Sequence, residues 1–188
     1  MTKVAFKPGT LIYPLPALMV SCGTMEHPNI VTVAWTGTLC SDPPMCYISL
    51  RKERYSYGLI RESGEFVLNL TTEELARATD WCGVKSGRDV NKFKLMGLTP
   101  EKSQLLEAPL VAESPLSIEC KVVEVRELGS HDMFIANVVA VDAEEKLIDP
   151  TTGAFQLNHA HPMAYSHGKY YALGEKIGSF GFSVKKRR

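Results

Sequence analysis

Residues 28–57 read PNIVTVAWTGTLCSDPPMCYISLRKERYSY, and this stretch decides the fold. Its first part, 30–36, is a mostly apolar run, which is typical of a strand buried on at least one face. A turn at Gly37 follows, and then the pair Pro43-Pro44. Because proline cannot donate a hydrogen bond to a sheet, we expect the next strand to begin after this pair and to span 45–50.

Two cations, Arg51 and Lys52, end that strand directly before a segment, 53–60, with a helical pattern. A helix N-terminus presents free backbone N–H groups and a partial positive charge, and the Ser56 hydroxyl would add another donor. With the two cations, these groups make a plausible seat for one phosphate. A solvated charge pair ahead of a helix has the same pattern, so the local residues leave both interpretations open.

Working outward, we expect segment 17–24 to be a buried strand that forms a hairpin with 30–36, and 45–50 to be a third neighbour in the same sheet. The helix that follows should end at Gly64, because glycine is the usual residue at a helix C-terminus. The chain should then return as a strand over 66–70. These elements already form a sheet with one helix beside it.

Thr71 and Glu74 have the spacing of a capping box, which predicts a helix from there to Gly83. The following segment, 85–115, mixes glycine, proline and charge with short apolar pieces. This composition predicts a loop with brief helical turns that covers a barrel mouth or a partner subunit.

Segment 116–126 alternates with period two and then slips at Val123, which predicts a β-bulge. A turn at 129–132 leads to 133–141, which should return as a long antiparallel strand beside it. Near the end of the chain, 163–165 and 170–173 form another predicted strand pair. Many strands with few helices favour a mainly β fold, a Greek-key β-barrel with peripheral helices, in a single domain over 1–188.

Composition excludes several classes of function. Lys plus Arg and Asp plus Glu both number 21, so the whole chain has no field that would attract nucleic acid or an anionic membrane. The one basic block, 185–188, is expected to be a solvated end. With no signal-like apolar segment at the start and no 18-residue apolar run, we expect a cytoplasmic protein that does not bind membranes.

Cysteine and histidine spacing predicts no metal site. The five cysteines show no C-x-x-C pair and suit buried, reduced thiols in a reducing compartment. His159 and His161 lack a nearby carboxylate or thiolate, so a solvated loop is the preferred interpretation there. The chain also has neither G-x-G-x-x-G after a strand nor a Walker P-loop, so a nicotinamide cofactor would bind only transiently.

Several motifs in order resemble the flavin reductase-like family of FMN-binding split barrels, close to its flavoredoxin branch. They cover nearly the whole chain, and together they are fairly specific. The matching motifs are Asn29-x-x-Thr32-x-x-Trp35, Ser41-Asp42-Pro43-Pro44, Ser49-Leu50-Arg51-Lys52, Tyr55-Ser56, 65–69 (EFVLN), 129–135 (GSHDMFI) and 170–175 (YYALGE).

The resemblance implies a resident FMN and a homodimer with the flavin near the subunit interface. It assigns the phosphate to Arg51, Lys52 and Ser56, and the wall of the isoalloxazine ring to Thr32, Val33, Ala34 and Trp35, with Asn29 and Ser49 as further cofactor contacts. From the residues alone, a tryptophan in such a run is more often part of the core.

His131 lies in the family's turn motif and is implied to position the incoming electron donor. A turn histidine that bonds Asp132 or the backbone is the alternative interpretation. The turn holds Ser130 where many relatives have Asp, which leaves the donor's identity open.

Three functions remain open at this point. The first is an FMN-dependent reductase that passes electrons from NAD(P)H to free flavin, ferric iron or a quinone. The second is a flavoredoxin-type electron carrier with a protein donor, and the third is a split barrel that only binds a ligand. The cations and Ser56 favour flavin binding over the third, and nothing in the sequence separates the first two.

Overall fold

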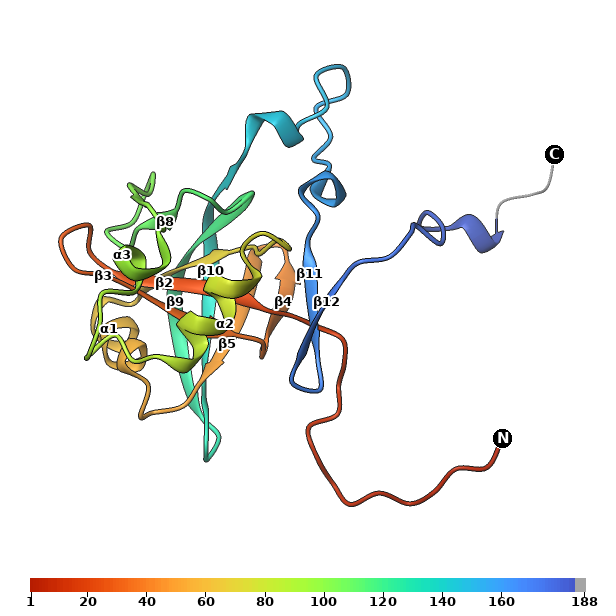
Figure 1. Cartoon of the computed structure of the whole chain (residues 1–188), viewed down its shortest axis with the longest axis horizontal. Coiled ribbons are helices and arrows are strands. Elements are labelled where there is room, and N and C mark those ends of the chain that lie inside the picture. The colour runs from red at the N-terminus through yellow and green to blue at the C-terminus, as the bar shows by residue number, and fades with distance from the viewer. Residues whose placement is uncertain (185–188) are drawn as a thin grey trace.

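A seven-stranded antiparallel sheet forms the body of the protein in the computed structural model, which describes residues 1–184 (Figure 1). The basic block 185–188 lies outside the described residues. In spatial order the strands are β3 (Pro28–Val33), β2 (Leu18–Gly23), β6 (Glu65–Asn69), β9 (Leu116–Glu127), β10 (Asp132–Ala143), β5 (Pro44–Leu50) and β4 (Thr36–Ser41). The expected mainly β, Greek-key architecture is confirmed.

The predicted hairpins agree with the observed strand pairing. β2 pairs with β3 from Leu18 opposite Val33 to Gly23 opposite Pro28. The β9–β10 pair has two register shifts, and one of them falls where Val123 has no partner, as the slip in alternation predicted. The sheet therefore follows the hydrophobic pattern wherever two strands are joined by a short turn.

Three expectations about the strands were wrong. β5 pairs with β10 and β4 rather than with β2, and it meets the predicted 30–36 segment only at its end, where the Ser49 N–H donates to the carbonyl of Trp35 and Ile48 lies opposite Thr36. The expected turn at Gly37 lies within strand β4, and β5 begins at Pro44 rather than after it. Pro44 is tolerated because it is exposed at the end of β5, where it lies opposite Ser41 of an edge strand.

Both helices that the sequence predicted between strands are present. Helix α1 (Tyr55–Ser63) ends at Gly64, which has the left-handed conformation expected of a C-cap (φ 70°). Helix α2 (Ala76–Val84) begins later than predicted. The predicted capping box does not form: the Thr71 side chain turns to the carbonyl of Ala17, and Thr72 Oγ1 accepts a 3.3 Å hydrogen bond from the Leu75 N–H.

Segment 85–115 contains one short helix, α3 (Lys92–Met96), and two short strands, β7 (Pro100–Glu101) and β8 (Leu110–Val111), that pair with each other. It covers the outer face of the sheet. Phe93 and Val111 pack with Met19 and Ile30 of β2 and β3 in one cluster, separate from the core inside the barrel. β3 is thus covered on both faces, which explains its mostly apolar sequence.

A second, three-stranded sheet, which we call the outer sheet, lies beside the barrel. It consists of β11 (Met163–Ser166), which pairs with β12 (Lys169–Ala172) as predicted and with the short β1 (Leu15–Pro16). The segments before β1 and after β12 extend away from the body (Figure 1). The remaining elements are three 3₁₀ turns, η1 (Glu145–Leu147), η2 (Leu157–Ala160) and η3 (Phe182–Val184).

All five cysteines are free thiols, and four of them are buried. Cys46 and Cys120 approach each other inside the barrel, with 3.4 Å between their sulfur atoms. No helix of the described part of the chain has both the length and the apolar character needed to span a bilayer.

Candidate functional site

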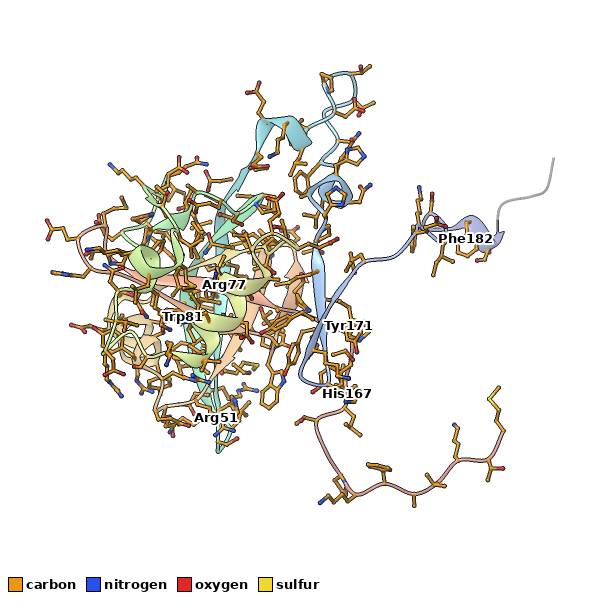
Figure 2. The ribbon with its side chains drawn as sticks, viewed as in Figure 1. Arg51, Arg77, Trp81, His167, Tyr171 and Phe182 are labelled. Carbon is orange, nitrogen blue, oxygen red and sulfur yellow. The ribbon has the colours of Figure 1, made fainter. Side chains whose placement is uncertain are left out.

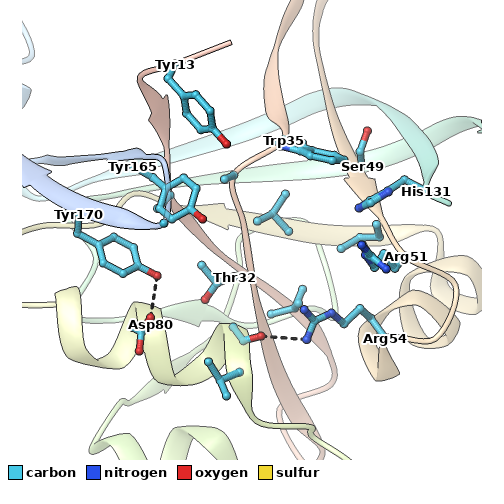
Figure 3. A pocket seen from close by; sticks show the side chains of 18 residues that line it. Tyr13, Thr32, Trp35, Ser49, Arg51, Arg54, Asp80, His131, Tyr165 and Tyr170 are labelled. Atoms are coloured by element: carbon cyan, nitrogen blue, oxygen red, sulfur yellow. Dashed lines mark hydrogen bonds between the residues drawn. The ribbon is translucent and has the colours of Figure 1, made fainter. Parts of the chain in front are cut away.

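A cavity of about 460 Å³ lies between the barrel and the outer sheet (Figure 3). The ends of β3 and β5 form its barrel side, helix α2 forms its floor, and β11 and β12 stand opposite. Most of the residues that the sequence singled out line it: Thr32, Val33, Ala34, Trp35, Ser49, Arg51 and His131. The structure therefore gathers residues from three distant segments at one place.

A second cavity of about 410 Å³ continues from the first. The two share Val31, Arg51, Arg54 and Val84 in their linings. Ser56 lines the second cavity on the α1 side, and the loop after α2 faces it with Lys85, Ser86, Gly87 and Arg88. We call this region, with Arg51 and Arg54, the cationic end of the site.

Asn29 and Ser56 are joined below the cationic end. The Asn29 Nδ2 group donates to Ser56 Oγ at 2.7 Å, and both side chains are buried. The loop passes so close above them that a Cβ atom on Gly87 would lie 2.0 Å from Asn29 Oδ1 and 2.8 Å from the ring of Tyr55. Glycine is therefore required at position 87 for the loop to close over this pair.

Lys52 is not among the residues that line either cavity. Its Nζ atom lies 3.1 Å from Glu127 Oε2 and 3.5 Å from Asp132 Oδ2. Asp132 is fully buried and also accepts a 2.6 Å hydrogen bond from the Tyr57 hydroxyl. Burial alone would raise the pKa of Asp132, but the Tyr57 hydrogen bond and the charge of Lys52 outweigh it and lower the pKa. Lys52 thus ties the start of α1 to the β9–β10 turn.

His131 stands at the cavity mouth beside Trp35, with 4.4 Å between the ring centres. Its Nδ1 atom lies 2.9 Å from the Ser130 hydroxyl, so its partner is Ser130, while the neighbouring Asp132 bonds Tyr57. Burial, and after it the charge of Arg51, lowers the pKa of His131 below the usual 6.5. The imidazole is therefore neutral at neutral pH.

Sequence reasoning missed part of the cationic end. Arg54 lies in the quoted stretch but was not singled out; its guanidinium donates to the carbonyl of Gly83 at 2.9 Å and so joins α1 to α2. Lys85, Ser86 and Arg88 lie in the segment that was predicted to be a loop covering a barrel mouth or a partner subunit, with no part in binding a cofactor. Their only local signal is the polar, glycine-containing run 85–88, which is typical of many loops.

The opposite end of the cavity was only partly expected: Tyr170 lies in the matching motif 170–175, whereas Tyr13, Tyr165 and Asp80 were not singled out. Tyr13, Tyr165 and Tyr170 line it together with Asp80 of α2. The ring centres of Tyr165 lie 6.2 Å from Tyr13 and 5.5 Å from Tyr170, and the Tyr170 hydroxyl donates to Asp80 at 3.1 Å. Burial and the charge of Asp80 raise the pKa of Tyr170 to about 12. We call this region the tyrosine end.

His159 and His161 lie elsewhere, in a separate cavity that also contains four glutamates, Glu73, Glu74, Glu113 and Glu144. Within residues 1–184, no group of three or more histidine, cysteine or carboxylate side chains has an arrangement that could hold a metal ion.

Three comparisons place the fold and site among known proteins. The model of the flavin reductase like domain matches residues 10–174. Flavoredoxin of Desulfovibrio vulgaris (Miyazaki F) has a similar structure, with a TM-score of 0.90 and 33% identity over 98% of this chain and 100% of that one. A protein assigned as a flavin reductase with a split barrel domain, from Shewanella frigidimarina NCIMB 400, gives a TM-score of 0.79 at 24% identity, covering 88% of this chain and 85% of that one. The expected split-barrel fold is thereby confirmed.

A curated relative has a named activity. The reductase component of 4-nitrophenol 4-monooxygenase/4-nitrocatechol 2-monooxygenase from Rhodococcus opacus is 26% identical over 127 residues, which are 66% of this chain and 65% of that protein.

Proposed function

The chain belongs to the flavin reductase like family, and on this premise we propose that it is an FMN-dependent oxidoreductase. In this proposal NAD(P)H is the electron donor and a small molecule is the acceptor, with free flavin, ferric iron and quinones as candidates. The observation that carries the proposal is the pair of joined cavities, one walled by strand β3 and the other bordered by cations.

The residues of the cationic end fit a phosphate. Arg51, Arg54 and Arg88 offer guanidinium donors, and Ser56 and Ser86 offer hydroxyl groups around a cavity that a glycine loop closes. Bidentate guanidinium groups suit a phosphate better than point charges do. Lys52 is used in a different way, since its ion pairs with Glu127 and Asp132 hold it away from this cavity.

The first cavity fits a planar ring. Val33, Ala34 and Trp35 give it a wall from the end of β3, and Thr32 is held in place because its hydroxyl donates to the carbonyl of Thr79 on α2. Bound FMN would supply the redox chemistry by accepting a hydride and returning the electrons. The task of the chain is to bind and orient the ring and to exclude water from it.

His131 has a positioning role in this proposal. A neutral imidazole tilted against Trp35 at the cavity mouth offers its Nε2 atom to the amide group of an incoming nicotinamide without adding charge, because Nδ1 is already bonded to Ser130. The Ser130 hydroxyl at Nδ1 restricts the orientation of the ring.

The proposal is tested by anaerobic stopped-flow absorbance of the FMN-loaded protein, mixed with NADH and separately with NADPH. Oxidised flavin absorbs near about 450 nm, so rapid loss of that band would support the reductase and identify its donor. Failure to load FMN would overturn the proposal.

A second candidate is an electron carrier of the flavoredoxin type, which the similarity to the Desulfovibrio protein favours. It predicts tight FMN binding without bleaching by either nicotinamide, together with rapid reduction by a protein donor. The same stopped-flow measurement therefore separates the two candidates.

We also propose that the protein is a homodimer. Apolar side chains are exposed on both terminal segments, including Phe6 at 79%, Ile177 at 94% and Phe180 at 107%. Figure 2 shows Phe182 on the C-terminal arm, well away from the barrel. A second subunit would cover these side chains, and sedimentation equilibrium would give its stoichiometry.

A further inference from the structure

The tyrosine end of the cavity differs in origin from the barrel wall opposite it. Tyr165 and Tyr170 belong to the outer sheet, and Tyr13 lies in the segment that enters the same sheet. Figure 3 shows the three hydroxyl groups directed toward the cavity, across from Trp35 and His131. A ligand held by the barrel strands would therefore expose one side to these hydroxyls.

The hydroxyls of Tyr13 and Tyr165 are available to a ligand. Within residues 1–184 neither makes a side-chain hydrogen bond, whereas the Tyr170 hydroxyl donates to Asp80. Both rings are held in place by aromatic neighbours, Tyr13 by His167 at 4.3 Å and Tyr165 by Tyr170 at 5.5 Å between ring centres. Two fixed donors thus face the same space.

The charges at this end favour an uncharged ligand. The cations Arg51 and Arg54 belong to the opposite end of the cavity, and Asp80 is the charged side chain that lines the tyrosine end. An anionic ring placed beside Asp80 would meet a like charge in a partly desolvated site, which is unfavourable.

We propose that Tyr13 and Tyr165 form the binding site for the electron acceptor, and that the acceptor is an uncharged planar ring bearing a carbonyl oxygen, of which quinones are the simplest class. The inference rests on the proposed function, because reduced FMN is the reductant. A quinone that takes a hydride from reduced flavin and one proton from solvent becomes a hydroquinone, and the flavin returns to its oxidised form.

The two tyrosines contribute by hydrogen bonding. A phenol O–H that donates to the carbonyl oxygen becomes a better partner as negative charge develops there during hydride transfer. Tyr170 acts as a positioning residue, because its hydroxyl is committed to Asp80 while its ring packs against Tyr165.

The test is the reoxidation of photochemically reduced, FMN-loaded protein by 1,4-benzoquinone, followed by stopped-flow absorbance. We expect Tyr13→Phe and Tyr165→Phe each to raise the half-saturating quinone concentration by about three- to tenfold, the scale of one lost hydrogen bond. FMN affinity, measured separately by fluorescence titration, should change by less than about twofold. Tyr171→Phe is the matched control, since Tyr171 lies on β12, the strand that pairs with the β11 strand of Tyr165, and is half exposed, outside the cavity lining.

An anionic sulfonated benzoquinone tests the class of ligand. It should require a higher half-saturating concentration than benzoquinone, and Asp80→Asn should narrow the difference. Equal behaviour of the two quinones in the wild type, or unchanged half-saturation in both tyrosine variants, would overturn the proposal. So would a loss of FMN affinity in step with quinone affinity, because the tyrosines would then belong to the flavin.

Equilibrium binding of menadione, followed by quenching of intrinsic fluorescence in the flavin-free protein, gives an independent measurement. The measurement needs no flavin, so it separates the two levels of inference. A protein that fails to load FMN disproves the proposed function, whereas menadione binding that is unchanged in both tyrosine variants disproves the acceptor site.

Discussion

The two ends of the cavity are built in different ways. The cationic end takes Arg51, Arg54 and Ser56 from one short stretch and adds the loop 85–88. The tyrosine end collects its side chains from positions 13, 80, 165 and 170, which only the packing of the outer sheet against α2 brings together. Residues that are close in sequence are visible as a motif, and residues that meet through packing are not.

The largest expected effect tests the cationic end. Arg51→Ala should weaken FMN binding by about 1.5–3 kcal/mol, the scale of a lost charged hydrogen bond. Lys52→Ala removes the same charge one residue later, yet it should have a much smaller effect because Lys52 faces Glu127 and Asp132. Fluorescence titration of FMN measures both, and equal losses would show that general charge, rather than a contact at Arg51, holds the phosphate.

The next effect tests how the loop closes over that end. Gly87→Ala places a methyl group against Asn29 and Tyr55, and overpacking of this kind costs about 1–3 kcal/mol of the free energy of unfolding. Gly58→Ala is the control, because nothing lies within 4 Å of its Cβ position in α1; it should stabilise the protein by about 0.5–1 kcal/mol. Urea denaturation measures both, and a neutral Gly87→Ala would contradict the close packing.

The smallest expected effect is on the pKa of His131, which should respond to a substitution at the cationic end and not to one at the tyrosine end. In a Trp81→Phe background, fluorescence of Trp35 should report protonation of His131 with a midpoint below pH 6.5. Arg51→Ala should raise this midpoint only in part, because burial is the larger cause of the lowered pKa, and Tyr165→Phe should leave it unchanged. A midpoint at or above pH 6.5 in the Trp81→Phe protein itself would contradict the proposed neutral imidazole.

The lowered pKa of His131 also makes the free energy of unfolding depend on pH. Because folding lowers the pKa of His131, the unfolded chain binds this proton more readily. The associated stability is present above the unfolded pKa and is lost as the pH falls through 6.5 toward the folded pKa. His131→Gln should remove this part of the pH dependence in thermal unfolding.

Local pattern predicted much of the barrel. The β2–β3 hairpin, the bulge at Val123 and the end of α1 at Gly64 all follow from residues within a few positions of one another. The predicted capping box was wrong because the Thr71 side chain turns to the carbonyl of Ala17, a tertiary partner that no local pattern reveals, and Thr72 accepts from the Leu75 N–H in its place. The pairing of β5 with β10 was not predicted for a similar reason: when two strands are far apart in the sequence, the packing of the whole sheet determines whether they become neighbours.

The sequence by itself determined the mainly β class, the family and the stretch from Arg51 to Ser56, because periodicity and motif order are written along the chain. Only the tertiary structure decided that Arg51 faces the cavity while Lys52 turns to Asp132, and that Tyr13 and Tyr165 stand opposite Trp35. The physical reason is that the direction of a side chain at a strand end, and the meeting of distant segments, depend on which partners the folded chain supplies.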